Sequence, residues 1–143
     1  YMAETLARTR SFTNPIHAIL LAFPVALYPA ALLSDITYLN TAVIQWTNFS
    51  SWLIAGADVF AGLVLAWALV SQFLGRARQR GLAYVIVVAL MFVAGVLNAF
   101  QHARDGWHSV GTFGLVLSIL CTILAFVAAF LAYGQTQVKE YRA

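Results

Sequence analysis

Four long apolar stretches constrain what this chain can fold into. They cover approximately residues 16–34, 51–74, 82–101 and 109–133. A helix needs about 20 apolar residues to cross a hydrocarbon layer about 30 Å thick. Because lipid offers no water to the backbone, a spanning segment has to satisfy its own N–H and C=O groups, as an α-helix does. The chain is therefore predicted to be an all-α integral membrane protein, with residues 1–143 forming one transmembrane domain, a bundle of four transmembrane helices.

The composition supports a membrane protein over a soluble one. Hydrophobic residues make up 62% of the chain and charged residues only 9%, whereas charged residues are about 25% of an ordinary soluble domain. The lone Cys121 lies inside an apolar stretch, so it predicts neither a disulfide nor a thiolate metal cluster. The first apolar stretch has internal prolines and no small-residue cleavage site, so we expect a span rather than a cleavable signal peptide.

The basic residues predict the orientation in the membrane. Cytoplasmic loops carry an excess of Lys and Arg. Of the eight basic residues, only Arg104 falls on one side of the predicted spans, and both termini are then expected to be cytoplasmic. The other seven are Arg8, Arg10, Arg76, Arg78, Arg80, Lys139 and Arg142. Since they flank spans instead of forming one basic face, the net charge of +3 indicates the lipid bilayer and not nucleic acid as the partner.

Local signals place the first span and the segment after it. Asn14 and Pro15 form a helix start, with Asn as the N-cap and Pro at the first helical position. Pro24 and Pro29 each remove one backbone hydrogen bond, so we expect a kinked helix supported by its neighbours. The segment from Asp35 to about Asn48 is too apolar for a free loop and too short to span. It is predicted to lie at the interface, where an aromatic belt would form. That belt would include Tyr38, Trp46 and Trp52.

The fourth span carries small residues at alternating spacings of three and four. This period of 3.5 places them along one helix face. In lipid, small residues let helix backbones approach closely, so such a face predicts a tight helix–helix contact. The predicted packing seam consists of Gly111, Gly114, Ser118, Cys121, Ala125, Ala128 and Ala132. Cys121 is interpreted as a small packing residue within this seam.

Polar residues in the second and third spans are spaced so that they share a face with small residues. In the second span, Asp58 precedes Gly62 and Ala66 at intervals of four. In the third span, Gly95, Asn98 and His102 are spaced by three and then four. Asp58 would lie roughly 10 Å below the outer surface. The sequence predicts an outward-facing polar cluster of Asp58, Asn98, His102 and His108. Two interpretations stay open: an intramembrane functional site, or an Asp58–Asn98 hydrogen bond that holds two helices in register.

The three histidines raise the question of a cofactor such as haem b or a quinone. His17 is predicted near the cytoplasmic surface, whereas His102 and His108 are predicted near the outer surface. About 30 Å of hydrocarbon would separate the two levels, so His17 cannot share one haem with either of the others. His102 and His108 could hold one together near the outer surface, or bind polar partners at the interface.

His17 alone could ligate a cofactor, bind a quinone, or make a structural bond to Gln72 or Tyr84. No catalytic motif and no metal-binding spacing is present, so no catalytic or metal-binding residue is assigned.

The segment at positions 14–27, Asn-Pro-Ile-His-Ala-Ile-Leu-Leu-Ala-Phe-Pro-Val-Ala-Leu, resembles the opening of the DUF2231 family of small bacterial membrane proteins. Pro15, His17, Phe23 and Pro24 carry the match, and Ala18 replaces a proline usual in the family. The dipeptide 34–35, Ser-Asp, fits its usual acidic residue, whereas Tyr84 stands where relatives often have a histidine. The resemblance implies four transmembrane helices in the bacterial inner membrane, in proteins found fused to or near redox domains.

Three functional hypotheses follow. The first is a non-catalytic accessory or membrane-anchor subunit of a larger membrane redox complex, with other membrane subunits as its partners. The second is an electron-transfer subunit that binds haem or a quinone through His17, or through His102 and His108. The third is a small-solute transporter that uses Asp58, because an ionisable residue inside a membrane often marks a solute or proton pathway.

Overall fold

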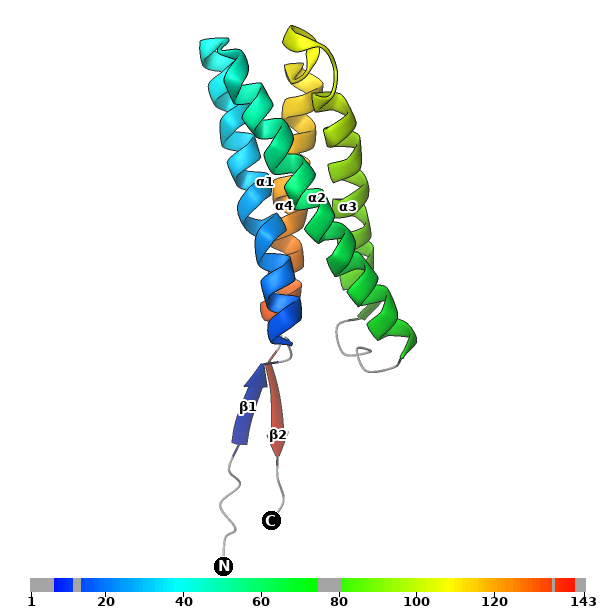
Figure 1. Cartoon of the computed structure of the whole chain (residues 1–143). Helices are drawn as coiled ribbons and strands as arrows, with labels where there is room; N and C mark the ends of the chain where they lie inside the picture. Colours follow the sequence, from blue (N-terminus) through cyan, green and yellow to red (C-terminus); the bar gives the residue numbers. More distant parts are fainter. Residues whose placement is uncertain (1–6, 12–13, 75–80, 135, 141–143) are drawn as a thin grey trace, which may run out of the picture.

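The computed structural model describes residues 7–11, 14–74, 81–134 and 136–140. Four long helices form the body of the molecule (Figure 1): α1 (Pro15–Thr41), α2 (Ile44–Phe73), α3 (Gly81–His102) and α4 (Gly111–Tyr133), with a 3₁₀ turn, η1 (Gly106–His108), before α4. Each of the four is long and apolar enough to cross a membrane. The predicted all-α, four-span membrane fold is confirmed.

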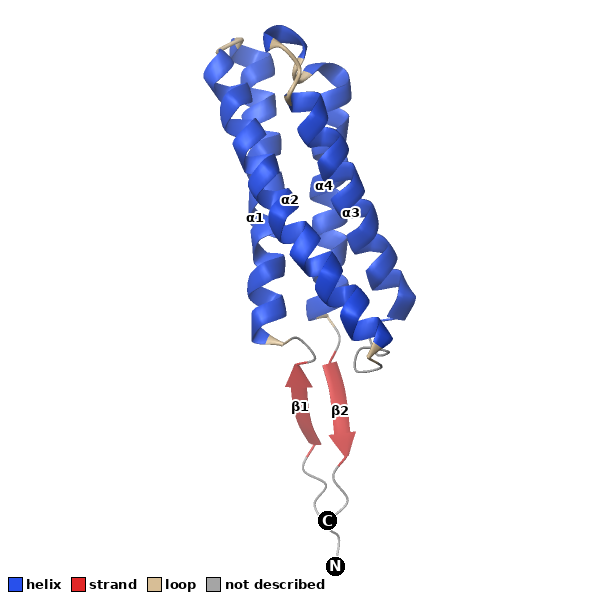
Figure 2. Cartoon of the chain, turned by 45° about the vertical axis from the view of Figure 1, so that its right-hand side comes forward, coloured by secondary structure: helices blue, strands red, loops and turns tan. Residues whose placement is uncertain are grey.

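Two short strands lie outside the bundle, and the sequence analysis did not predict them. β1 (Ala7–Ser11) pairs with β2 (Thr136–Glu140) in antiparallel register, with Arg8 opposite Lys139. Figure 2 shows this ladder beyond the end of the bundle at which α1 begins and α4 ends. Both strands therefore lie at the same end of the bundle. Four of the basic residues used to predict the orientation fall outside the described residues: Arg76, Arg78, Arg80 and Arg142.

The four helices pack as a ring in which each touches its two neighbours. α1 packs against α2 and α4, and α3 packs against the same two helices. In α1 and α2 the buried residues recur at alternating spacings of three and four. In α1 the repeat consists of His17, Leu21, Pro24, Tyr28, Ala31, Asp35 and Tyr38, with Ser34 buried beside it, and in α2 of Thr47, Ser50, Ile54, Ala57, Ala61, Val64 and Ala68. A repeat of 3.5 residues is typical of helices that pack with a small left-handed crossing angle.

α4 buries six of the seven residues of the predicted packing seam. Gly114, Ser118, Cys121, Ala125, Ala128 and Ala132 all face the bundle. Gly111 is exposed and has a φ of 53°, a left-handed conformation that favours glycine, so it begins the helix instead of packing within it. The buried small side chains face α1 and α3, the two neighbours of α4.

The predicted interfacial segment after the first span is wrong. α1 continues to Thr41 and α2 already begins at Ile44, so most of residues 35–48 are helical. Only Ala42 and Val43 separate the helices, and Ala42 adopts a left-handed φ of 54° with its N–H bonded to the carbonyl oxygen of Tyr38. The first span was predicted to end here because polar residues follow it, yet several of these polar side chains face the bundle interior.

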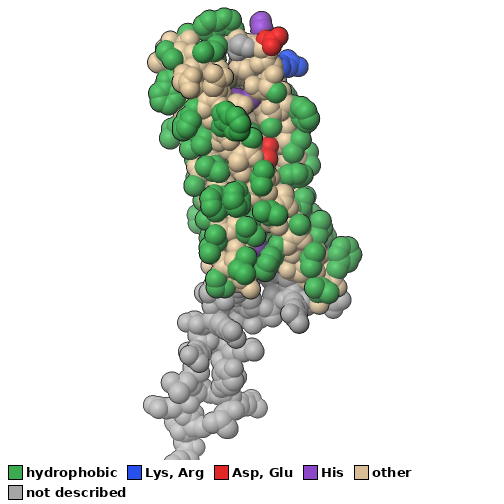
Figure 3. Space-filling view, in the orientation of Figure 1, with side chains coloured by type: hydrophobic (Ala, Val, Ile, Leu, Met, Phe, Trp, Pro, Cys, Tyr) green, Lys and Arg blue, Asp and Glu red, His purple; other side chains and the backbone are tan. Residues whose placement is uncertain are grey.

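The predicted aromatic belt is correspondingly smaller. Trp46 and Trp52 are exposed, as an interfacial belt requires, but Tyr38 is buried and its ring stacks 6.4 Å from that of Trp107. Lys and Arg are absent from the four helices, and Figure 3 shows hydrophobic side chains along the whole length of the visible face of the bundle. Such a surface suits contact with lipid or with other membrane helices.

Candidate functional site

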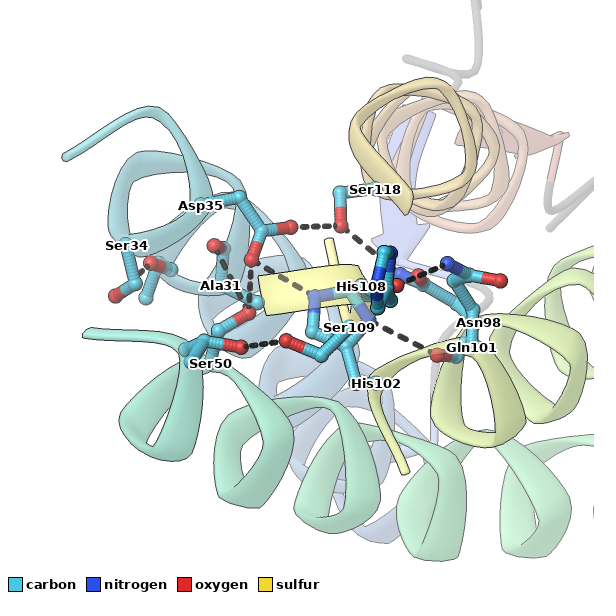
Figure 4. Close-up of polar contacts among 12 residues, drawn as sticks. Ala31, Ser34, Asp35, Ser50, Asn98, Gln101, His102, His108, Ser109 and Ser118 are labelled. Carbon is cyan, nitrogen blue, oxygen red and sulfur yellow. Dashed lines mark hydrogen bonds and ion pairs between the residues drawn. The ribbon is translucent and has the colours of Figure 1, made fainter. Parts of the chain in front are cut away.

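One buried carboxylate joins all four helices. Asp35, on α1, is fully buried. Its Oδ1 accepts hydrogen bonds from Ser50 Oγ of α2 at 2.5 Å and pairs with His102 Nε2 of α3 at 2.8 Å. Its Oδ2 accepts from Ser118 Oγ of α4 at 2.5 Å. Figure 4 shows these three side chains converging on Asp35 from different helices.

The other nitrogen of His102 determines how the proton is shared with Asp35. His102 Nδ1 lies 2.9 Å from the carbonyl oxygen of Asn98, and a carbonyl can only accept, so Nδ1 carries a hydrogen. A second hydrogen then has to lie between Nε2 and Asp35 Oδ1, since two lone pairs would repel at 2.8 Å. The pair is either an imidazolium with a carboxylate or a neutral imidazole with a carboxylic acid. Its net charge is zero in both states, which reduces the cost of burial.

Asn98 and Ser118 extend this network toward the middle of the bundle. Asn98 Nδ2 donates to Ser118 Oγ at 2.9 Å, and Ser118 in turn donates to Asp35. Asn98 is fully buried, and its carboxamide lies close enough to Cys121 to interact with the thiol. Its Oδ1 has no conventional hydrogen-bond partner among the described residues.

Two further bonds attach the helices to the η1 turn. Thr47 of α2 and Ser109 share a hydrogen bond between their hydroxyl oxygens at 2.7 Å. Gln101 Nε2 donates to the backbone oxygen of His108 at 3.1 Å. His108 therefore takes part through its backbone, while its side chain is exposed.

A second polar pair lies near the middle of the bundle. Tyr28 donates its hydroxyl hydrogen to Asp58 Oδ1 at 2.6 Å, which links α1 to α2. Asp58 is fourteen residues after Ile44, ~21 Å from the start of α2, whereas the predicted span began at about residue 51 and placed Asp58 roughly 10 Å from its start. Gly95 of α3 makes room for the pair, because a Cβ atom there would collide with the Asp58 carboxylate and the Tyr28 hydroxyl.

His17 lies at the other end of the bundle. It is fully buried, and its Nε2 shares a hydrogen bond with the Tyr84 hydroxyl at 2.6 Å. Its ring also lies 6.2 Å from that of Trp67. Eighteen residues of α1, ~27 Å, separate His17 from Asp35, so the two polar groups lie toward opposite ends of the bundle.

The predicted outward-facing cluster is divided in the structure. Asn98 and His102 belong to the Asp35 network, whereas Asp58 bonds to Tyr28 and His108 points its side chain to the outside. Asn98 donates to Ser118 and not to Asp58, so the proposed Asp58–Asn98 bond is replaced by two separate pairs. The observed network is centred on Asp35, a residue that was predicted to lie just after the first span and was not assigned to the site. The signal that could have found it is its position three and four residues from Tyr38 and Ala31, in phase with the buried face of α1.

The chemistry of this site is that of a closed hydrogen-bond network. A haem ligand has to offer a nitrogen lone pair, and both nitrogens of His102 already have hydrogen-bond partners within the protein. His17 Nε2 is likewise bonded to Tyr84. Within the described ranges, no group of three His, Cys, Asp or Glu side chains is placed to hold a metal ion.

Asp35→Asn is expected to destabilise the bundle strongly. An amide offers one oxygen and one donating nitrogen, so it cannot accept from Ser118 and also from Ser50 and His102. Removing one partner of a buried ion pair typically costs about 3–5 kcal/mol. The midpoint of thermal unfolding in detergent measures the change. Asp105→Asn, at an exposed position in the η1 region, is the control and should change stability by less than about 0.5 kcal/mol. Equal midpoints for the two variants would refute the central role of Asp35.

Gly95→Ala should destabilise the bundle by about 1–3 kcal/mol, because the added methyl group overfills the space beside Asp58 and Tyr28. Tyr28→Phe removes one of the colliding atoms, so the double variant should lose less than the sum of the single losses. Gly56→Ala is the matched control, since its Cβ would lie 3.5 Å from Leu27 Cδ1, an ordinary contact. Additive losses in the thermal midpoints would count against the close approach of Gly95.

Comparison with known proteins agrees with this architecture. The family model described as "Predicted membrane protein (DUF2231)" matches residues 13–143. No curated protein and no solved structure gives a significant match. The match covers the whole bundle, including every residue of the Asp35 network, and agrees with the resemblance noted at positions 14–27. The chain belongs to the DUF2231 family of predicted membrane proteins.

Proposed function

We propose that this protein is a non-catalytic accessory or membrane-anchor subunit of a larger membrane redox complex. The observation that carries the proposal is the Asp35 network, in which one carboxylate bonds to side chains from the other three helices. Hydrogen bonds between membrane helices hold them in a defined arrangement. The buried polar side chains at the end of the bundle near the α1–α2 turn thus form hydrogen bonds with one another. Such bonding suits a rigid module that positions other subunits.

The core between the two ends of the bundle also favours a structural role over transport. Between the level of Asp58 and that of His17, the interior is filled by apolar side chains. They include Leu21, Val64, Val88 and Met91, all fully buried. A solute or ion pathway needs polar groups or water along its length. This apolar layer therefore makes the transporter hypothesis the weaker one.

The haem or quinone hypothesis would require the histidines to exchange partners. His102 would have to leave Asp35, and His17 would have to leave Tyr84, before either nitrogen could ligate iron. Without the imidazole, the buried Asp35 carboxylate would keep only its two serine hydrogen bonds and would have no charge partner. The redox context itself rests on the family resemblance, because members of that family are found fused to or near redox domains.

The same proposal includes a location and an orientation. We place the protein in the bacterial inner membrane with both termini in the cytoplasm, since seven of the eight basic residues lie on the side of the termini. A reporter enzyme that is active only outside the cytoplasm, fused after Ala143, should therefore be inactive. The same reporter inserted at the η1 turn, beside Asp105, should be active. The reverse pattern would invert the orientation.

The central test is purification of the tagged full-length chain from its native membranes in mild detergent. Stoichiometric recovery with subunits that carry haem, iron–sulfur or dehydrogenase activity is the expected result. An unrelated four-helix membrane protein with the same tag is the control for carry-over. A chain recovered alone, with a reducible Soret band that His102→Ala abolishes, would instead favour the haem-binding alternative.

A further inference from the structure

We propose that the face of α2 around Asp58 docks a transmembrane helix of a different protein, and that this helix presents a basic side chain to the Asp58 carboxylate. The proposal rests on the proposed function, since it names how an accessory subunit would recognise its neighbour. It concerns a different site from the Asp35 network, which is closed within the chain.

Asp58 differs from Asp35 in having bonding capacity left over. Tyr28 supplies one hydrogen bond to Oδ1, and no described residue supplies one to Oδ2. Asp35 is fully buried, whereas Asp58 is only half-buried. Figure 3 shows a small area of acidic surface surrounded by hydrophobic side chains, about midway along the bundle. An ionisable group at such a depth is costly when it faces hydrocarbon and calls for a partner.

The surface around Asp58 is shaped for a close helix contact. Small residues lie three, four and eight positions away from it on the same side of α2. Ala55 and Ala66 are exposed, and Gly62 is half-buried beside the Phe92 ring of α3. Small side chains let a second helix approach closely in lipid, where packing and hydrogen bonding drive association. A helix seated there would cover the remaining surface of the carboxylate.

The charge of the site decides what kind of helix fits. A second copy of this chain is a poor partner, because its four helices contain no Lys or Arg. A two-fold axis at this face would instead bring two Asp58 carboxylates together. An Arg or Lys on another protein supplies both the opposite charge and N–H donors for the open oxygen. The complementary partner is therefore a different membrane protein with a basic residue at mid-bilayer depth.

Site-specific photocrosslinking in native membranes tests the proposal. A photoreactive phenylalanine analogue at Ala55 reports on this face, and the same analogue at Ile123, an exposed position on α4, is the control on a helix that is not a neighbour of α2 in the ring. We expect the Ala55 probe to give a protein adduct whose crosslinked helix contains Arg or Lys. Asp58→Asn should lower the yield roughly tenfold, because a hydrogen bond to a charged group is lost.

Asp58→Asn keeps an oxygen that can accept from Tyr28, so the fold should be retained, and Asp58→Leu serves as a second variant without any acceptor. Thermal unfolding of each purified variant establishes that loss of the adduct is not loss of the fold.

An Ala55 adduct that persists undiminished in folded Asp58→Asn would overturn the proposal. So would an adduct with a second copy of this chain, a partner helix without a basic residue, or crosslinking to lipid alone. If redox subunits still co-purify with the chain in any of these cases, only the docking site fails and the accessory role stands. If the unaltered chain has no stoichiometric partner, both fail.

Discussion

The arrangement of the bundle depends on the need to satisfy a buried carboxylate where there is no water. Asp35 places two oxygens among four apolar helices, and each oxygen accepts from a side chain on another helix. Because lipid is as apolar as the helix surfaces, burial of hydrophobic area alone does not choose one packing over another. A set of bonds that forms only when all four helices are in register makes that choice. The small residues of α4, such as Cys121 and Ala125, then allow the backbones to approach closely.

The polar groups are distributed unevenly along the bundle. The end nearest the α1–α2 turn holds the Asp35 network, and the middle holds the Asp58–Tyr28 pair. Apolar side chains follow, and the His17–Tyr84 pair lies near the opposite end. Each pair joins α1 to another helix, so α1 contributes to every polar level. The residues that resemble the DUF2231 pattern are also concentrated in α1, which contains both His17 and Asp35.

The sequence predicted the four spans and their class, because length and hydropathy are determined by the thickness of the hydrocarbon layer. It also placed Gly114 to Ala132 on one face, since a period of 3.5 can be read directly. It failed at Asp35, because a polar residue at the end of an apolar run looks like the end of a span. The pairings of Asp58 with Tyr28 and of Asn98 with Ser118 depend on how helices rotate against one another. That rotation is a property of the packed bundle, and a single helix does not encode it.

The shared proton of Asp35 and His102 has a consequence for an energised membrane. A transmembrane potential of about 100 mV does work of about 2.3 kcal/mol on one elementary charge carried across the whole layer. The pair has no net charge, and its proton moves less than the 2.8 Å between Nε2 and Oδ1, which is about a tenth of the layer. The field can therefore change the balance between the two protonation states by only ~0.2 kcal/mol. The Asp35–His102 connection between α1 and α3 is thus almost insensitive to the membrane potential.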